Sequence, residues 1–218
     1  MSATPIRIDF VSDVVCPWCA IGLTALEQAI ARVGDAASVE LHFQPFELNP
    51  QMAAEGEDTG EHLARKYGID AEQIARNREA IRERGAALGF TFNARGRIYN
   101  TFDAHRLLHW AALESAERER ALKHVLLRAY FTDGEDVSSH PVLVRLATEA
   151  GLDATRAQQI LDSGEYADEV RARERYYLER GIHSVPAIVL NERHLISGGQ
   201  PVEVFEQALR QLAAANNP

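Results

Sequence analysis

The residues Cys16-Pro17-Trp18-Cys19 stand between two segments of different periodicity, and this junction decides the fold. Before it, apolar residues alternate with charged ones across residues 6–10, a period of two that is typical of a β-strand with one buried face. After it, apolar side chains recur at helical spacing across residues 18–33. Proline suits the first turn of a helix and glycine its end, so Pro17 and Gly34 fit the two ends. We therefore expect the cysteines at a strand-to-helix corner.

Two further strand-containing segments are predicted after this corner. Apolar and polar residues alternate across residues 39–44 and Pro45 closes the strand, so the chain begins as β-strand, helix, β-strand. Towards the C-terminus, apolar runs at residues 188–190 and 195–196, separated by a turn, predict two more strands. A final helix with one apolar stripe begins near Pro201. This end therefore reads as β-strand, β-strand, helix.

Helical patterns dominate the middle of the chain. Three apolar stripes at helical spacing predict helices there. They lie at residues 107–112, 122–129 and 142–147. We therefore expect an α/β domain made of residues 1–46 and 183–218, interrupted by an all-helical inserted domain at residues 47–182.

Composition and charge limit the kinds of partner. The chain has 218 residues, a formal net charge of −9 and a pI near 5.4. Negative charge disfavours binding to nucleic acid and anionic lipid, and no apolar run reaches about 18 residues, the length that spans a bilayer. The N-terminus lacks the pattern of a secretory signal, so we expect a cytoplasmic protein with neither nucleic acid nor membrane as partner. Monomer and homodimer are both left open.

The chemistry predicted for the cysteine pair is thiol–disulfide exchange. Unpaired backbone N–H groups and the positive end of the helix dipole favour an anion at Cys16, which makes this sulfur the expected nucleophile. Cys19 lies one turn further along, with its Cα within about 5–6 Å of that of Cys16, so a disulfide between them is geometrically allowed. Cys19 is therefore expected to resolve the mixed disulfide that Cys16 forms.

Zinc binding is the alternative use of two cysteines at this spacing. Such a site needs two further ligands, and the available donors are His105 and His109, which are spaced i, i+4 on a predicted helix. The chain has no second cysteine pair, so we expect no metal site.

A second candidate element is Val185-Pro186, directly before the apolar run at residues 188–190. Proline has no N–H to donate to a sheet and is tolerated at the start of a strand, which is a sufficient structural reason for its position. The functional alternative is a cis peptide bond, which would leave the Val185 backbone free to pair with an extended substrate. Periodicity alone leaves both interpretations open.

The chain resembles the DsbA family of thioredoxin-fold proteins, and within it the FrnE-like branch. The resemblance rests on five segments in a fixed order, at residues 13–22, 45–50, 100–107, 181–186 and 196–201. It implies a thioredoxin-like α/β fold, βαβ followed by ββα, with a large all-helical insertion between the halves. It also implies a thiol–disulfide oxidoreductase with Cys16 as nucleophile, Cys19 as resolving thiol and Pro186 as a cis-proline facing them.

A cytoplasmic reductase or isomerase fits this resemblance, acting on disulfides of proteins or small molecules. No bound cofactor is expected, and glutathione is a candidate co-substrate. One alternative is a glutathione-dependent isomerase or transferase of the 2-hydroxychromene-2-carboxylate isomerase or kappa type, in which Val185 and the turn at Ser197 and Gly198 hold the tripeptide. The other alternative is a redox-inactive binding or chaperone protein, because a fold alone does not assign chemistry.

The remaining candidates are expected to line the cleft around the dithiol. Trp18 is predicted to cover one side of the Cys16 sulfur. Around residues 100–106 a cation would stabilise a thiolate, although the same segment also fits a helix entrance capped by Thr101 or Asp103. The substrate-binding candidates are Pro17, Trp18, Val185, Pro186, Asn100, His105, Arg106, Ser197 and Gly198.

Overall fold

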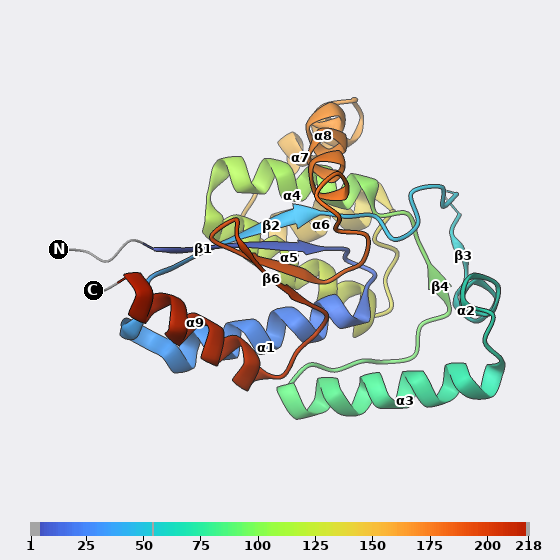
Figure 1. The fold of residues 1–218 in the computed structure, drawn as a ribbon. Helices are drawn as coiled ribbons and strands as arrows, with labels where there is room; N and C mark the ends of the chain where they lie inside the picture. The colour runs from blue at the N-terminus through green and yellow to red at the C-terminus, as the bar shows by residue number, and fades with distance from the viewer. Residues whose placement is uncertain (1–4, 54, 217–218) are drawn as a thin grey trace.

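A mixed four-stranded sheet organises the protein in a computed structural model that describes residues 5–53 and 55–216 (Figure 1). Its strands are, in spatial order, β2 (Val39–Pro45), β1 (Ile6–Ser12), β5 (Ala187–Leu190) and β6 (His194–Ser197). β1 runs parallel to β2 and antiparallel to β5, and β6 is antiparallel to β5. In this register Phe10 of β1 is paired with Phe43 on one side and Ile188 on the other.

Two helices cover one face of the sheet. α1 (Pro17–Val33) connects β1 to β2, followed by a 3-10 turn (Gly34–Ala36), and α9 (Val202–Asn216) follows β6. They lie side by side (Figure 1). α1 ends where Gly34 takes a φ of 53° and donates its N–H to the carbonyl of Ile30. The predicted βαβ and ββα halves, and the helix end at Gly34, are confirmed.

The chain between β2 and β5 is helical apart from two short strands. Among the described residues its helices are α2 (Thr59–Tyr67), α3 (Ala71–Leu88), α4 (Phe102–Glu114), α5 (Ala116–Phe131), α6 (His140–Glu149), α7 (Ala154–Leu161) and α8 (Ala167–Leu178). β3 (Glu57–Asp58) and β4 (Arg97–Ile98) form a separate antiparallel pair. The insertion is therefore not entirely helical, because strands of two residues leave no periodic pattern in a sequence.

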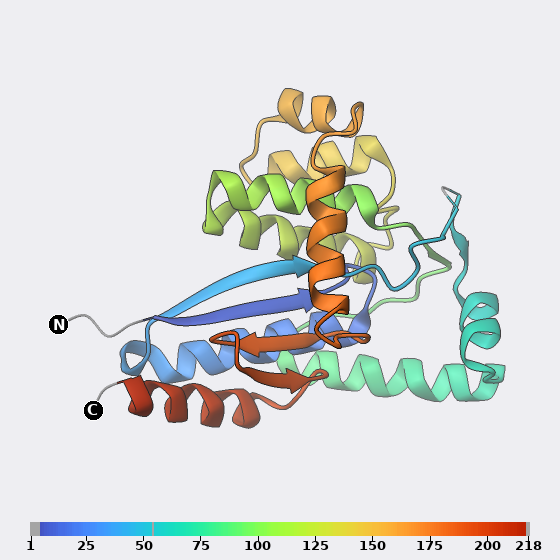
Figure 2. The ribbon, with the colours of Figure 1, turned by 45° about the horizontal axis from the view of Figure 1, so that its top comes forward.

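The inserted helices share one hydrophobic core with the sheet. Phe10 of β1 belongs to the same buried cluster as Leu107 of α4 and Leu126 of α5. Helices α4, α5 and α8 contact β2, and α3 contacts α1 on the other side of the molecule (Figure 2). The expected domain boundaries at residues 46/47 and 182/183 stay a prediction. No helix in the described part of the chain is both long and apolar enough to cross a membrane.

Candidate active site

The cysteine pair lies at the first turn of α1, just after β1. Cys16 is the N-cap residue: its backbone is extended, with φ −92° and ψ 113°, and its carbonyl accepts the N–H groups of Cys19 and Ala20 at 3.0 and 3.3 Å. Pro17 begins the helix, and it has no N–H that would need a partner there. Cys16 therefore occupies the end of the helix where the dipole favours a negative charge.

The two cysteines are free thiols in nearly water-free surroundings, with 3% of Cys16 and 0% of Cys19 exposed. Burial raises the pKa of Cys19 well above its usual value, and contact with Cys16 raises it further. Cys19 therefore keeps its proton in the resting protein, and it needs help to lose that proton when it attacks.

The loop before β5 faces Cys16. The Cys16 thiol donates to the backbone carbonyl of Val185, with 3.7 Å between sulfur and oxygen. The Val185-Pro186 peptide bond is cis, so the cis alternative is confirmed. Pro186 comes close to α1 because residue 22 is glycine: a Cβ on Gly22 would lie 3.1 Å from Cγ of Pro186.

A glycine turn after β6 lies beside the first turn of α1. A Cβ on Gly199 would lie 2.9 Å from the carbonyl oxygen of Trp18, so only glycine allows this close approach. Gly198 has a φ of +80° and donates its N–H to the carbonyl of Pro186 at 2.8 Å. Ser197 is exposed at the end of β6. The turn is near the dithiol, and the Gly198 N–H is already engaged within the protein.

Trp18 is in contact with a residue of the insertion. Its side chain is exposed, and the guanidinium carbon of Arg84 on α3 lies 5.1 Å from the indole centroid. Arg84 also donates to the carbonyl of Gly199 at 2.9 Å. Cation–π attraction and this hydrogen bond together attach α3 to the first turn of α1. That Trp18 limits access to the Cys16 sulfur stays a prediction.

His105 lies against the buried carboxylate of Asp13, just before the cysteine pair. Its Nε2 is 3.4 Å from Oδ1 of Asp13, and the N–H of Leu48 donates to Oδ2 at 2.8 Å. Burial alone would raise the pKa of Asp13, but His105 and the Leu48 N–H lower it below its usual value. The backbone carbonyl of Asp13 accepts the N–H of Cys16 at 3.3 Å. His105 therefore belongs to a buried polar layer that holds this corner.

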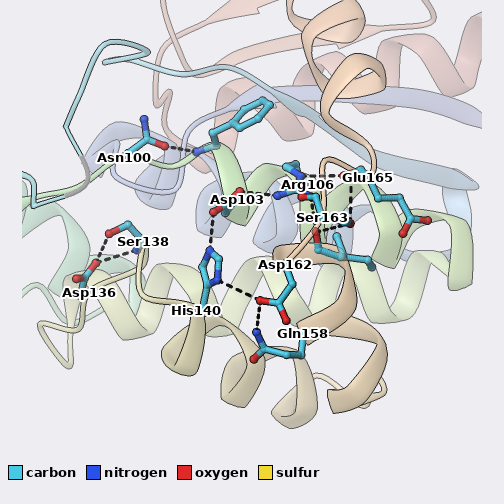
Figure 3. Close-up of polar contacts among 12 residues, drawn as sticks. Asn100, Asp103, Arg106, Asp136, Ser138, His140, Gln158, Asp162, Ser163 and Glu165 are labelled. Carbon is cyan, nitrogen blue, oxygen red and sulfur yellow. Dashed lines mark hydrogen bonds and ion pairs between the residues drawn. The ribbon is translucent and has the colours of Figure 1, made fainter.

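Arg106 has its hydrogen-bond partners inside the insertion (Figure 3), and that it lines the cleft stays a prediction without a contact to support it. It is buried, and its Nη1 donates to Oδ1 of Asp103 at 2.8 Å. Its other donors bind the backbone carbonyls of Ile160, Ser163 and Glu165. Arg106 therefore ties α4 to the end of α7 and the loop that follows.

Asn100 is positioned at the entrance of α4 and supports it. Its Oδ1 accepts the N–H of Phe102 at 2.9 Å, and its Nδ2 donates to the carbonyl of Met52 at 3.3 Å. Thr101 is the N-cap residue but makes no capping hydrogen bond through its side chain. The side chain that caps this entrance is Asn100, where the sequence indicated Thr101 or Asp103, and that Asn100 also lines the cleft stays a prediction.

Sequence reasoning missed a buried ionisable pair on α5. Lys123 is 1% exposed; burial lowers the pKa of its amine, whereas negative charge on Cys19 or Asp13 raises it. Glu119 accepts the N–H of Phe43 at 3.3 Å, and burial raises its pKa to about 7. The two residues are spaced i, i+4 within the buried stripe of α5. A charged residue on an apolar helical stripe is the signal that would have found them.

Two residues at the end of α2 were also missed. Burial lowers the pKa of Lys66, while negative charge on Asp13 and Cys16 opposes that shift. Burial raises the pKa of Tyr67, and Cys16 adds to the effect. Lys66 donates to the carbonyl of Leu48 at 2.8 Å, which fixes its amine at the edge of the site. α2 has few apolar residues, so no apolar stripe in the sequence marked it.

A metal site was considered for the cysteines with His105 and His109. His109 packs against Tyr166 with tilted rings, whose centroids are 5.1 Å apart. Across residues 5–53 and 55–216 there is no cluster of three or more His, Cys, Asp or Glu side chains that could hold a metal ion.

Two thiols at the first turn of α1, facing a cis-proline loop and supported by a β2-β1-β5-β6 sheet, define a thioredoxin-fold protein with a vicinal dithiol. Residues 7–210 match the DSBA-like thioredoxin domain family, and the chain belongs to this family. The resemblance to the DsbA family is thereby confirmed.

Matches to proteins of known structure cover nearly the whole chain. The chain is similar to a probable DsbA oxidoreductase from Streptomyces coelicolor, with 37% identity, a TM-score of 0.90, and coverage of 98% of this chain and 92% of that one. It shares the fold of 2-hydroxychromene-2-carboxylate isomerase (13% identity, TM-score 0.72, coverage 96% and 97%). It also shares the fold of the cytosolic disulfide reductase DsbM from Pseudomonas aeruginosa, solved with GSH (17% identity, TM-score 0.64, coverage 95% and 99%).

A curated sequence relative is protein YwbO of Bacillus subtilis strain 168. The two are 27% identical over 205 residues, which cover 94% of this chain and 96% of YwbO. The match therefore includes both halves of the α/β fold and the insertion.

Proposed function

We propose that the protein is a thiol–disulfide oxidoreductase that reduces or isomerises disulfides of protein or small-molecule substrates. The Cys16 thiolate attacks one sulfur of the substrate disulfide; a Cys16–substrate bond forms, the substrate S–S bond breaks, and the leaving thiolate takes a proton. Cys19 then loses its proton, attacks the Cys16 sulfur and releases the second substrate thiol. The substrate gains two electrons, and the protein is left with a Cys16–Cys19 disulfide. Isomerisation results when another substrate thiol attacks in place of Cys19.

One observation carries this proposal: the two thiols have different environments one helical turn apart. Cys16 is the N-cap of α1 and faces the carbonyl of Val185. Cys19 is inside the helix, fully buried, with a raised pKa. A nucleophile needs a site that tolerates negative charge, whereas a resolving thiol must stay protonated until the mixed disulfide exists.

The electrons need a source, and we propose glutathione as the co-substrate. Two glutathione molecules reduce the Cys16–Cys19 disulfide and leave joined as oxidised glutathione, so the protein itself needs no bound cofactor. The shared fold with DsbM, a cytosolic reductase solved with GSH, supports this choice. We place the activity in the cytoplasm, where thiols are kept reduced.

A glutathione-dependent isomerase or transferase is the second candidate, because 2-hydroxychromene-2-carboxylate isomerase has the same fold. Such a reaction uses glutathione directly and has no step for a second protein thiol. A buried Cys19 in contact with Cys16 has a role only in disulfide exchange, which favours the oxidoreductase.

Insulin reduction with glutathione or a synthetic dithiol tests the proposal. Wild type should accelerate the reaction, and Cys16→Ser should lower the rate by about a hundredfold or more while its thermal unfolding temperature stays close to that of wild type. Full activity of Cys16→Ser would refute the mechanism. Glutathione addition to an electrophile that survives this substitution would support the second candidate, and inactivity of the wild type in both assays would support a binding or chaperone role.

A further inference from the structure

A cavity of about 270 Å³ lies between β2 and the insertion. Its walls come from β2, α4, α5 and α8, which meet above the β2 edge of the sheet in Figure 2. Neither cysteine lines it, nor does the Val185-Pro186 loop. Its lining residues are Arg7, His42, Phe43, Gln44, Pro45, His105, Leu108, His109, Ala112, Leu113, Glu119, Lys123 and Arg173.

The polar part of the lining is rich in basic side chains. Arg173 contributes a guanidinium, Lys123 an amine, and His42 and His109 two imidazoles; burial lowers the pKa of Lys123 and of His109. The carboxyl group in the lining is that of Glu119, and burial raises its pKa to about 7, so it is only partly ionised at neutral pH. The cavity therefore attracts a negative charge.

Lys123 is the most informative of these residues. It is 1% exposed, and none of the described residues offers its Nζ a hydrogen bond or a carboxylate within 4.0 Å. The ring of Phe43 lies 5.7 Å away and provides only a cation–π contact. The amine therefore has no direct partner, and the negative charges that stabilise it, on Cys19, Asp13 and Glu119, act from a distance against the cost of burial.

A second buried polar atom, on His42, lines the same cavity. The Nε2 atom of His42 is inaccessible and has no hydrogen-bond partner in the described part of the chain. Two unsatisfied polar groups in one cavity indicate a ligand that can bond to both.

The rest of the lining is apolar. Phe43 and Leu108 are buried, and Leu113, which is 64% exposed, lies where the cavity meets solvent. A cavity near 270 Å³ is at the small end of ligand sites and accepts a molecule of about ten non-hydrogen atoms. The combination fits an acid with a short apolar body rather than an inorganic anion.

We propose that this cavity binds a small organic carboxylate, whose charged group pairs with Lys123 and whose apolar body contacts Phe43 and Leu108. Neither cysteine lines the cavity, although Lys123 also acts on the pKa of Cys19, and the proposal does not depend on the function proposed above.

Isothermal titration calorimetry at neutral pH with benzoate as probe tests the assignment. Benzoate should bind saturably at one site per chain, whereas benzamide, which has the same shape without the charge, should bind at least tenfold more weakly. Inorganic phosphate tests charge without an apolar body, and it should also bind at least tenfold more weakly than benzoate.

Two variants and a matched control locate the site. Lys123→Met keeps the length of the side chain and removes the charge, and it should weaken benzoate binding about ten- to a hundredfold. His42→Leu should weaken it by a smaller factor, and it provides a test that leaves the buried lysine in place. Arg120→Met removes one positive charge from the exposed side of α5, where Arg120 pairs with Glu27, and should leave binding unchanged.

The proposal is overturned if benzoate gives no saturable heat, if benzamide or phosphate binds as well as benzoate, or if both Lys123→Met and His42→Leu bind it like the wild type. Loss of binding in Arg120→Met equal to that in Lys123→Met would also overturn it, because the attraction would then come from net charge alone.

Discussion

The Sγ atom of Cys16 lies 3.7 Å from the backbone carbonyl oxygen of Val185, and the thiol is the donor. This hydrogen bond exists only while Cys16 carries its proton, because a thiolate has nothing to donate to a carbonyl. Ionisation of Cys16 therefore releases the Val185 carbonyl. An extended substrate can then pair with that carbonyl by adding a strand-like segment beside the loop.

Replacement of Cys19 should trap the first intermediate. In Cys19→Ser the mixed disulfide between Cys16 and a substrate forms but has no neighbouring thiol to resolve it, so it should accumulate. Mass spectrometry after mixing with a glutathione-disulfide substrate should show one adduct per chain. Cys16→Ser serves as the control and should show none, and an adduct on Cys19 in that variant would contradict the assigned order.

Removal of the Lys123 charge should slow the second step more than the first. The amine lowers the pKa of Cys19 against the stronger effect of burial, so Lys123→Met leaves the resolving thiol harder to ionise. We expect resolution to slow by about tenfold, which corresponds to about 1.4 kcal/mol in the barrier. Single-turnover quenching separates the two steps. Arg120→Met is the matched control, and equal resolution rates in both variants would argue against a role for Lys123.

Stability should fall as the pH rises towards neutrality because of Glu119. Its folded-state pKa of about 7 is raised above the usual value, so the folded protein binds its proton more tightly than the unfolded chain does. The resulting stabilisation is complete below about pH 4 and is lost as the pH rises through about 7. Glu119→Gln keeps an acceptor for the Phe43 N–H without this dependence.

The measurement is urea unfolding of wild type and Glu119→Gln at about pH 4 and about pH 8. Between the lower and the higher pH, the wild type should lose up to about 3 kcal/mol of unfolding free energy relative to Glu119→Gln, since one pKa unit is worth about 1.4 kcal/mol. Parallel pH profiles for the two proteins would contradict the assignment.

Replacement of Arg106 should reduce stability and spare the chemistry. Arg106→Met removes one donor from each of the backbone carbonyls of Ile160, Ser163 and Glu165 and removes the guanidinium that pairs with Asp103, which should cost about 2–4 kcal/mol in urea unfolding. Insulin reduction at a temperature where the variant is folded should proceed at the wild-type rate. A loss of turnover with unchanged stability would instead place Arg106 in the cleft.

Addition of a methyl group at residue 199 should disturb the turn beside the dithiol. In Gly199→Ala the new Cβ would lie 2.9 Å from the carbonyl oxygen of Trp18, so the turn must shift, at a cost of about 1–3 kcal/mol. Gly164→Ala is the control, since no heavy atom lies within 4 Å of its Cβ position. Similar unfolding free energies for the two variants would show that the turn adapts without cost.

β1 and α1 were predictable because their apolar residues recur with a regular period. Apolar and charged residues alternate across residues 6–10, although the folded strand is buried on both faces, and α1 carries an apolar stripe, so periodicity alone located both. α3 was missed because its apolar residues are sparse: Ile74, Ile81 and Leu88 stand seven apart, and only Ile74 among them is buried. β3 and β4 were missed because two residues make no period.

The site was predictable to the extent that it is local in sequence. Cys16 and Cys19 belong to one motif, and their i, i+3 spacing on a helix determines the distance between their Cα atoms. The positions of Lys123, Lys66 and Arg84 depend on how the insertion docks on the sheet, which no local pattern records. The partners of Arg106 could not be predicted for the same reason, because a cation beside an apolar stripe can point into the insertion as well as towards the cleft.

The location of Lys123 on α5 has an evolutionary consequence. The inserted helices supply the amine of Lys123, whose charge lowers the pKa of Cys19. A chimaera that combined this sheet with the insertion of a distant homologue would inherit a different charge under its sulfurs, so the two segments are expected to have diverged together.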